Sequence, residues 1–340
     1  MVQISEKWLD ELFTGSRSKT IAVVGDIMLD RYIWGAVSRI SPEAPVPVVE
    51  VESESARLGG AANVAHNIHS LGGKGLLVGV AGNDASAEQL ERLLQSEGCS
   101  TEGIIRDGTR PTTVKTRIIA HSQHVARVDR ESRTEVAASL RNKMVAFLRD
   151  RIGEIDAIIL EDYNKGVVDK NLIADVVALG KEYGKIVTAD PKFNNFFEYK
   201  NVTVFKPNLK ETEEALGVKL RSPAEVEQAG RGIVGRLGAQ YVLLTQGEKG
   251  MSLFDGSGTI YHVPGRARHV ADVSGAGDTV IATLSLALAG GASAQEAATL
   301  ANYAGGVVCG EVGVVPITVN GLRTAVLRDL NHVPLSDGTA

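Results

Sequence analysis

The sequence predicts an α/β fold in which a mostly parallel sheet is sandwiched by helices and a small antiparallel sheet projects from it. Two observations carry this prediction. Short β-branched runs alternate with helical patterns along most of the chain, which is typical of a parallel sheet covered on both faces. Two other strand-like segments break that alternation. The chain has 340 residues, 44% of them hydrophobic, and no linker or repeat divides it, so we expect a single domain over residues 1–340.

The elements of the main domain are predicted in chain order. A short amphipathic helix is expected within residues 1–13, where charged residues are mixed with Trp8, Leu9 and Leu12. The strands of the main sheet are predicted at 20–24, 75–80, 157–160, 186–188, 202–205 and 241–244. Helices are predicted at 61–71, 88–95, 135–151, 170–183, 223–237 and 294–308. The apolar run at 279–284 predicts one more helix.

The segments that break the alternation lie at 45–51 and 112–128. Pro45 and Pro47 confine the first to a sheet edge, because proline cannot donate a ladder hydrogen bond. Both segments predict strands whose residues alternate in exposure. We expect the inserted strands, about 31–55 and 111–130, to form the small antiparallel sheet.

Composition excludes several classes of protein. The formal net charge of -5 argues against a nucleic-acid surface, which needs clustered Lys and Arg. Cys99 and Cys309 form no CxxC pair, so neither a disulfide framework nor a zinc site is supported. The N-terminus lacks the apolar core of a signal peptide, and the run at 281–289 is too short to span a bilayer of about 30 Å. We expect a cytoplasmic protein that binds neither nucleic acid nor membrane.

A glycine-rich segment late in the chain is the strongest candidate for chemistry. Gly275, Ala276 and Gly277 lead into Asp278, where an apolar helical run begins. Glycine permits unusual backbone angles and a helix start leaves N–H groups unpaired, so negative charge is stabilised there. An Asp could simply cap the helix. A cap does not account for the whole set with Asp272 upstream, whereas Asp278 fits a base that takes a proton from a group attacking a phosphoryl centre.

Polar residues also follow the predicted strands at the point where each strand ends. Open α/β sheets bind ligands beyond the carboxyl ends of their strands, so these positions are candidates for a site. They include Asp26, Asp30, Glu161, Asp162, Tyr163, Asn164, Lys165, Asp190, Lys192, Lys206, Asn208, Glu211, Thr245, Gly247 and Gly250. Each alone could be a turn or cap residue. Carboxylates gathered at one edge are costly unless a ligand or metal compensates their charge.

The segment from Asp272 to Asp278 is similar to the C-terminal signature of the ribokinase-like (pfkB-type) carbohydrate kinases. The resemblance implies a ribokinase-like fold in which the projecting strands form a lid over the sugar. It also implies that Asp278 is the catalytic base and that the amides of Gly275, Ala276 and Gly277 form the anion hole.

A second segment, Leu58 to Ala65, resembles another signature of that family. Paired glycines let the backbone approach a sugar closely, and an asparagine offers both a donor and an acceptor to hydroxyls. A helix N-terminal loop is the simpler interpretation. The resemblance implies that the sugar contacts are Asp30, Gly59, Gly60 and Asn63.

The resemblance also implies a site for ATP and Mg²⁺. Asn208 and Glu211, three apart at a helix start, are by themselves a common capping pair. The family has such an element at this place, where it positions magnesium and phosphate indirectly. Nucleotide contacts are implied for Asn208, Thr245, Gly247, Gly250 and Asn302, although Asn302 could instead be a solvent-facing helix residue. Family members often hold K⁺ near the anion hole, and carbonyls around Asp272 and 310–313 are candidates.

The segment at 34–50 is more distinctive and resembles the kinases of D-glycero-D-manno-heptose 7-phosphate. The similarity extends to 115–117, 127–131, 162–166 and 190–192, and so covers most of the chain. It implies ATP-dependent phosphorylation at O1 to the 1,7-bisphosphate, for ADP-heptose and lipopolysaccharide core biosynthesis. Many relatives fuse the kinase to an adenylyltransferase. This chain shows no HxGH motif, so the stand-alone kinase form is expected.

A phosphorylated sugar requires cations near its far end. The lid region contains Arg110, Lys115, Arg117, Arg127 and Arg130, some of which must simply be solvated. A guanidinium suits phosphate through paired hydrogen bonds, so we expect Arg127 to bind the phosphate, with Lys115 and Lys192 as the next candidates. Asp162, within the segment that resembles the heptose kinases, is also expected to contact the substrate. A homodimer through the lid is also expected, since the lid often supplies the dimer contact in that family.

Three alternatives remain open on the sequence. A kinase of the same fold could act on another sugar phosphate, such as a hexose 6-phosphate. The chain could also be a sugar-phosphate sensor that does not react. A dehydrogenase is the third, although the GxGxxG match at 230–235 lies inside a helical pattern, the reverse of a dinucleotide fold.

Overall fold

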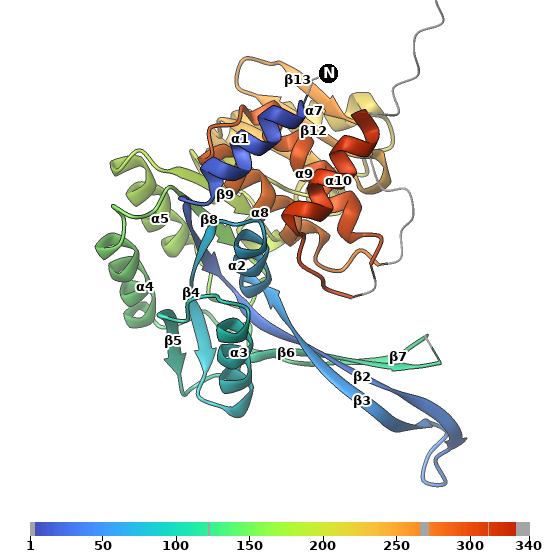
Figure 1. Cartoon of the computed structure of the whole chain (residues 1–340). Helices are drawn as coiled ribbons and strands as arrows, with labels where there is room; N and C mark the ends of the chain where they lie inside the picture. Colours follow the sequence, from blue (N-terminus) through green and yellow to red (C-terminus); the bar gives the residue numbers. More distant parts are fainter. Residues whose placement is uncertain (1–3, 122, 266–271, 312, 331–340) are drawn as a thin grey trace, which may run out of the picture.

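The computed structural model describes residues 4–121, 123–265, 272–311 and 313–330 (Figure 1). Within these ranges a nine-stranded sheet has the order β13-β12-β11-β10-β9-β8-β1-β4-β5. The bounds are β1 Thr20–Gly25, β4 Lys74–Gly82, β5 Gly103–Asp107, β8 Ala157–Glu161, β9 Ile186–Asp190, β10 Val204–Phe205, β11 Tyr241–Thr245, β12 Met251–Asp255 and β13 Ile260–Val263. All neighbours from β5 to β11 pair in parallel, and β12 and β13 are antiparallel additions at one edge.

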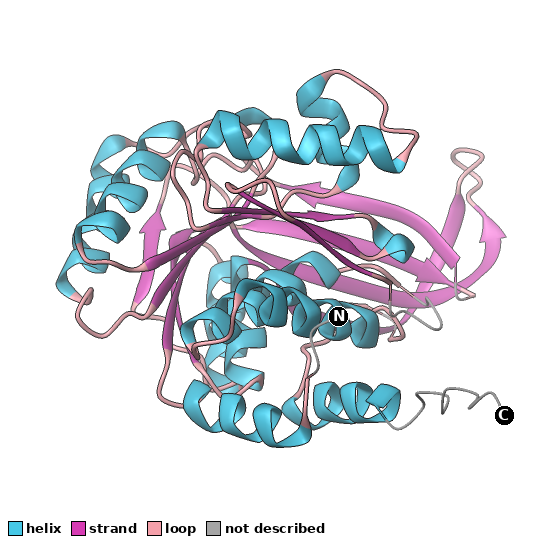
Figure 2. Cartoon of the chain, turned by 90° about the horizontal axis from the view of Figure 1, so that it is seen from above, coloured by secondary structure: helices cyan, strands magenta, loops and turns pink. Residues whose placement is uncertain are grey.

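Helices cover both faces of this sheet, and Figure 2 shows the sheet between two helical layers. Their bounds are α1 Glu6–Ser16, α2 Ala61–Ser70, α3 Ala85–Ser96, α4 Ala138–Asp150, α5 Lys170–Glu182, α6 Leu209–Leu216, α7 Pro223–Leu237, α8 Ala276–Ala289, α9 Ala294–Val308 and α10 Val319–Leu330. One hydrophobic cluster joins the sheet to α1, α2, α3, α8, α9 and α10. A second joins the opposite face to α4, α5 and α7. The predicted parallel α/β layering is confirmed.

Local sequence signals set the limits of several helices. Capping boxes begin α7 at Ser222 and Glu225 and begin α9 at Ser293 and Glu296. Helix α7 ends at Gly238, whose φ of 63° is the left-handed conformation that glycine accepts most readily. Such signals explain why these two helices match their predicted ranges. The sequence reasoning missed β5, β12, β13 and α10.

Four strands form the lid, in the order β3-β2-β6-β7, and Figure 1 shows them projecting from the main body. Their bounds are β2 Ile27–Ile40, β3 Pro47–Gly60, β6 Thr113–Ala120 and β7 Gln123–Arg130. The hairpins β2–β3 and β6–β7 are antiparallel, and a parallel β2–β6 pairing joins them. The proline-bearing strand β3 lies at an edge, as predicted.

The expected alternation of exposure in the lid strands is wrong. All eight residues of β7 are exposed, and β3 is open to solvent along most of its length. The reason is that this part of the lid stands clear of the main body, so neither face of the strands is covered within the described residues.

The lid is rooted at the end of β1. Strand β2 begins two residues after Gly25, the last residue of β1, and β3 runs directly into α2 through Gly60. Among the residues that the structure describes, no helix is both long and apolar enough to cross a membrane.

Candidate active site

Asp278 lies in the first turn of α8 and is 3% exposed. The residue before the helix, Gly275, has a φ of 78°, a left-handed conformation that favours glycine. The Asn63 side-chain amide donates to Oδ2 of Asp278 at 2.7 Å. The Tyr163 hydroxyl donates to Oδ1 at 2.6 Å. Two side chains from distant parts of the chain therefore hold the two oxygens of one carboxylate.

The environment of Asp278 shifts its protonation toward neutral pH. Burial raises the pKa of Asp278 to about 6, because the charged form loses its hydration. The hydrogen bonds from Tyr163 and Asn63 oppose this shift, whereas the nearby charge of Asp190 adds to it. A carboxyl with a pKa near 6 is well suited to accept a proton at neutral pH.

A pocket of about 230 Å³ opens beside the start of α8. Its lining includes Ala276 and Gly277 together with four predicted nucleotide residues, Thr245, Gly247, Gly250 and Asn302. Asn302 is buried and donates from its side chain to the Pro264 carbonyl at 2.8 Å, so it is not a solvent-facing helix residue. The structure thus brings the predicted anion hole and the predicted nucleotide turn to one pocket.

The predicted sugar contacts lie close to one another, and one of them, Asn63, contacts Asp278. Asp30 is buried and forms an ion pair with Arg117. A Cβ on Gly59 would lie only 2.3 Å from Oδ2 of Asp30, so this close approach requires glycine. Gly60, with a φ of 55°, begins α2 and places Asn63 in its first turn, where it reaches Asp278.

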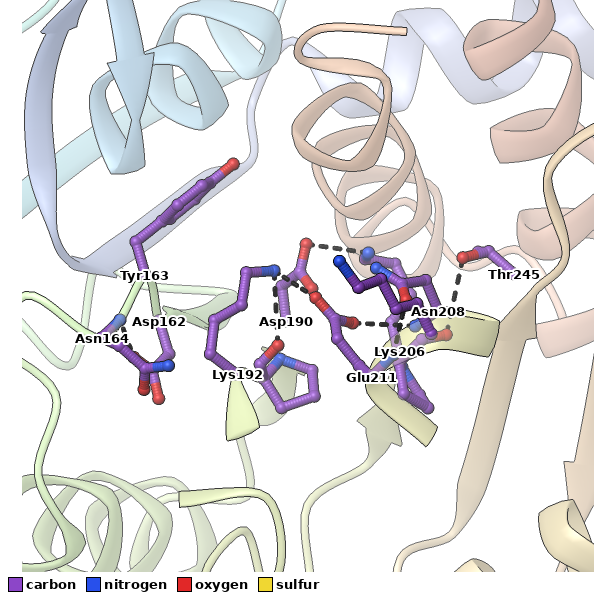
Figure 3. Close-up of polar contacts among 12 residues, drawn as sticks. Asp162, Tyr163, Asn164, Asp190, Lys192, Lys206, Asn208, Glu211 and Thr245 are labelled. Carbon is purple, nitrogen blue, oxygen red and sulfur yellow. Dashed lines mark hydrogen bonds and ion pairs between the residues drawn. The ribbon is translucent and has the colours of Figure 1, made fainter. Parts of the chain in front are cut away.

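Tyr163 lies between two predicted substrate lysines. The Nζ atoms of Lys115 and Lys192 are each 5.0 Å from the centre of its ring. Figure 3 shows Lys192 extending between Tyr163 and Glu211, with which it forms an ion pair. Lys115 has no ion pair within the described residues, and burial lowers its pKa.

Two other predicted substrate residues, Arg127 and Asp162, do not lie with Tyr163 and the two lysines. Arg127 lies on an exposed lid strand and makes two hydrogen bonds of 3.0 Å to Asp129. Asp162 is fully buried and accepts hydrogen bonds from the Asn164 amide at 2.7 Å and the Tyr199 hydroxyl at 2.8 Å. Figure 3 shows that Tyr163 and Asp162 extend in different directions. The geometry gives Asp162 the role of anchoring a turn.

Comparison with known proteins agrees with this geometry, since the model of the pfkB family of carbohydrate kinases matches residues 18–319. The chain belongs to this family. It is 42% identical over 305 residues to the bifunctional protein HldE of Citrifermentans bemidjiense, an alignment that covers 90% of this chain and 63% of that protein. The chain therefore spans less than two thirds of that relative's length.

Solved structures of the same fold include two kinases. Ribokinase of Arabidopsis thaliana complexed with ribose and ATP has a TM-score of 0.72 at 19% identity, and the match covers 93% of this chain and 99% of that chain. Phosphofructokinase-2 of Escherichia coli in complex with potassium has a TM-score of 0.73 at 19% identity, with 92% and 99% covered. The predicted ribokinase-like fold and the predicted carbohydrate kinase are confirmed.

The predicted magnesium residues of this carbohydrate kinase are engaged with each other. The Glu211 amide donates to Oδ1 of Asn208 at 2.8 Å, and the Asn208 amide donates to Oε2 of Glu211 at 2.9 Å. The second carboxylate oxygen of Glu211 binds Lys192. The structure therefore contains the capping pair that the sequence alone suggests, and an indirect role in metal binding stays a prediction.

A carboxylate set nearby fits a divalent cation better. Oxygens of Glu161, Asp190 and Asp278 lie within 4.8 Å of one another. Glu161 is 0% exposed, and neither of its carboxylate oxygens has a hydrogen-bond partner within the described residues. Burial raises the pKa of Glu161 well above its usual range. Because carboxylate oxygens are the ligands that Mg²⁺ prefers, Glu161 and Asp190 are the residues that would hold it.

Lys206 lies next to the anion-hole segment, where it forms an ion pair with Asp190. Its Nζ lies 2.8 Å from Oδ2 of Asp190, and both side chains are almost fully buried. A Cβ added to Gly277 would lie 3.6 Å from Asp190 and 3.7 Å from Lys206, so this pair lies directly against the glycine. Figure 3 shows the pair beside Glu211 and Asn208.

The carboxylate of Asp272 ties the anion-hole segment to the loop after α9. The Ser274 amide donates to its Oδ1 at 2.9 Å and the Gly313 amide to its Oδ2 at 3.0 Å. The carbonyls suggested for K⁺ belong to this loop, although residue 312 lies outside the described residues. Potassium binding stays a prediction.

The sequence named Tyr163, Glu161, Asp190 and Lys206 as candidates for a site, because each follows or ends a predicted strand, but it gave none of them a specific role. That position alone could not separate them from ordinary turn residues, because their partners lie on other strands, in other loops or, for Tyr163, on helix α8.

Proposed function

We propose that this carbohydrate kinase transfers the γ-phosphoryl group of ATP to the 1-hydroxyl of D-glycero-D-manno-heptose 7-phosphate. The observation that carries the proposal is the position of Asp278 in the first turn of α8. Ala276 and Gly277 of the same turn line the pocket of predicted nucleotide residues, and the Asp278 carboxylate accepts a hydrogen bond from the predicted sugar contact Asn63. The heptose itself rests on the sequence resemblance at 34–50. The product would be heptose 1,7-bisphosphate, a precursor for ADP-heptose and the lipopolysaccharide core.

The mechanism follows from the arrangement around Asp278. Its carboxylate takes the proton of the acceptor hydroxyl while that oxygen attacks the γ-phosphorus in line. The new O–P bond forms as the bond to the β-phosphate oxygen breaks, and ADP leaves with the electron pair. The amides of Gly275, Ala276 and Gly277 stabilise the charge on the transferring phosphate, and that of Ala276 also donates to the Val273 carbonyl at 3.3 Å. When bound, a divalent cation supplies further neutralisation of the phosphate oxygens, and Glu161 and Asp190 would hold it.

For the 7-phosphate we favour Lys115 over Arg127. Lys115 is partly desolvated, lacks an ion pair within the described residues and lies over the ring whose hydroxyl contacts the base. Arg127 is already paired with Asp129 on the exposed lid surface. A phosphate gains more from a cation that has lost its water and has no competing partner.

We also propose that two copies of the chain associate through their lids. Exposed apolar side chains gather there, with Ile40 60%, Val51 55% and Val128 55% exposed. The open edge β3 is mainly acidic, with Glu50, Glu52 and Glu54 beside Arg57, and the open edge β7 carries Arg127 and Arg130 beside Asp129. Sedimentation of the wild type and of a Val51→Glu, Val128→Glu double variant tests this, and a wild-type monomer would overturn it. A cytoplasmic location also stays a prediction.

The acceptor is tested with a coupled assay of ADP release over a panel of sugars. The panel contains heptose 7-phosphate, three hexose 6-phosphates and the unphosphorylated heptose. We expect the highest kcat/KM for heptose 7-phosphate and a new anomeric phosphate signal by ³¹P NMR. Because an ammonium recognises any phosphate, a hexose 6-phosphate kinase is the second candidate, and a higher kcat/KM for a hexose would favour it. Sugar binding without ATP turnover would instead favour a sensor.

A further inference from the structure

Within the described residues, the hydroxyl of Tyr163 makes the shortest hydrogen bond to the proposed base. It donates to Oδ1 of Asp278 at 2.6 Å, while Asn63 donates to Oδ2 at 2.7 Å. A carboxylate can only accept hydrogen bonds, so the phenol is the donor of this pair.

The Asp26 carboxylate holds the backbone of the turn that contains Tyr163. The amides of Tyr163, Lys165 and Val167 donate to the Asp26 carboxylate at 2.7, 3.1 and 3.2 Å. Asn164, in the middle of this turn, has a φ of 55°, a conformation that non-glycine residues seldom adopt. Because three hydrogen bonds converge on one buried side chain, the turn has little freedom to move.

The ring of Tyr163 is held as firmly as its backbone. The ammonium groups of Lys115 and Lys192 each lie 5.0 Å from the ring centre, within the range of cation–π attraction. Lys115 comes from the lid and Lys192 from the turn after β9. The phenol hydroxyl is therefore presented to Asp278 at a defined place.

We propose that Tyr163 is a positioning residue for phosphoryl transfer, whose hydroxyl works with the Asn63 amide to hold the Asp278 carboxylate in the orientation that meets the acceptor hydroxyl. The inference rests on the proposed role of Asp278 as base. A carboxylate has about four acceptor sites. Tyr163 and Asn63 occupy two of them, so lone pairs remain for the acceptor and the phenol does not block the reaction.

The surroundings of Asp278 explain why its carboxylate needs the two hydrogen bonds from Tyr163 and Asn63. Oxygens of Glu161 and Asp190 lie within 4.8 Å of those of Asp278, so its charge is placed beside other buried carboxyl groups. Of the groups that face it, Lys192 also favours the ionised form, and Tyr163 and Asn63 supply the direct hydrogen bonds. Without the phenol, the Asn63 amide alone would hold the carboxylate among the described residues, so the carboxylate would rotate more easily away from the acceptor.

Tyr163→Phe removes the hydroxyl and keeps the ring between the two lysines. A hydrogen bond to a charged group typically stabilises by an amount that corresponds to about a 10- to 100-fold change in rate. We expect kcat to fall by about that factor while KM for ATP and for the sugar phosphate change less than about threefold. Tyr163→Leu also removes the ring, so KM for the sugar phosphate should rise in addition.

Tyr199→Phe is the matched control. Tyr199 is another buried tyrosine that donates to a carboxylate, that of Asp162, at 2.8 Å. The variant should lower the melting temperature without changing kcat or KM beyond about twofold. An equal loss of kcat in Tyr199→Phe and Tyr163→Phe would reduce the role of Tyr163 to stability and overturn the inference.

Asp278→Asn separates the two ways in which the account could fail. If Asp278→Asn is inactive and Tyr163→Phe has wild-type kcat, the positioning role is wrong and the proposed function stands. If Asp278→Asn keeps wild-type turnover, the proposed base is wrong and the inference falls with it. A selective loss of kcat in Tyr163→Phe, with Asp278→Asn inactive, supports both.

Discussion

Replacing Lys115 by Met would test which lid cation binds the far phosphate of the substrate. Methionine keeps an unbranched apolar stem of similar length, so contact with the Tyr163 ring is largely retained while the charge is lost. Burial already lowers the pKa of Lys115, which means that part of its hydration is absent before substrate binds. A phosphate that arrives there gains an ion pair at a reduced desolvation cost.

The size of the effect can be estimated from the geometry. Two unit charges 4 Å apart interact by about 4 kcal/mol at an effective dielectric of 20. The net value of a charged hydrogen bond after desolvation is about 1.5–3 kcal/mol. Lys115→Met should therefore raise KM for the sugar phosphate about 10- to 100-fold, with kcat and KM for ATP nearly unchanged. Steady-state ADP release at saturating ATP measures this directly.

Arg127→Met is the matched control on the same sheet. The Arg127 side chain is 59% exposed and paired with Asp129, and pairs of this kind contribute about 0–1 kcal/mol. Its KM should change less than about fivefold. With the unphosphorylated sugar, both variants should resemble the wild type. A Lys115→Met enzyme with KM within twofold of wild type, or a larger rise in Arg127→Met, would refute the assignment.

Two further predictions concern the base and the nucleotide pocket. The pKa of Asp278 is raised to about 6, so kcat/KM should fall about tenfold per pH unit below pH 6. An Asp with an ordinary pKa would instead start this fall near pH 4. A kcat/KM that stays constant between pH 4 and 6 would contradict this prediction. Gly250 has a φ of 90°, and a Cβ there would lie 2.1 Å from the Val263 carbonyl oxygen. Gly250→Ala should therefore raise KM for ATP at least about tenfold. Gly256→Ala is the control and should leave KM unchanged, because a Cβ there would have no atom within 4 Å. Equal KM values for the two variants would show that the turn does not shape the pocket.

The layered fold could be predicted from periodicity because each buried strand and covering helix shows its own pattern in sequence. The nine-residue β4 and the 15-residue α7 are examples. The lid strands were found because they break the alternation of the main domain and have the pattern of strands with alternating exposure, but that exposure was predicted wrongly. Periodicity assumes that one face is covered, and β7 has no cover within the described residues.

The candidate site was predictable where one short segment holds the chemistry. The motif that ends at Asp278 is of this kind, and so is the turn from Thr245 to Gly250. The contact between Asn63 and Asp278 joins residues 215 apart, and that between Tyr163 and Asp278 joins residues 115 apart. No local pattern encodes such a contact, because it depends on the fold bringing together the starts of helices α2 and α8 and the loop after β8.

The central claim is that Asp278 activates the acceptor while the neighbouring amides receive the phosphoryl group. Asp278→Asn keeps the size and shape of the side chain, but it replaces one of the two acceptor oxygens by an NH2 donor and removes the ability to take a proton. Measured with the preferred sugar phosphate at pH 7.5, about the plateau expected from the acid limb, its kcat should fall by about 10²- to 10⁴-fold or more with ATP affinity little changed. A variant that turns over within a few-fold of wild type would contradict the account.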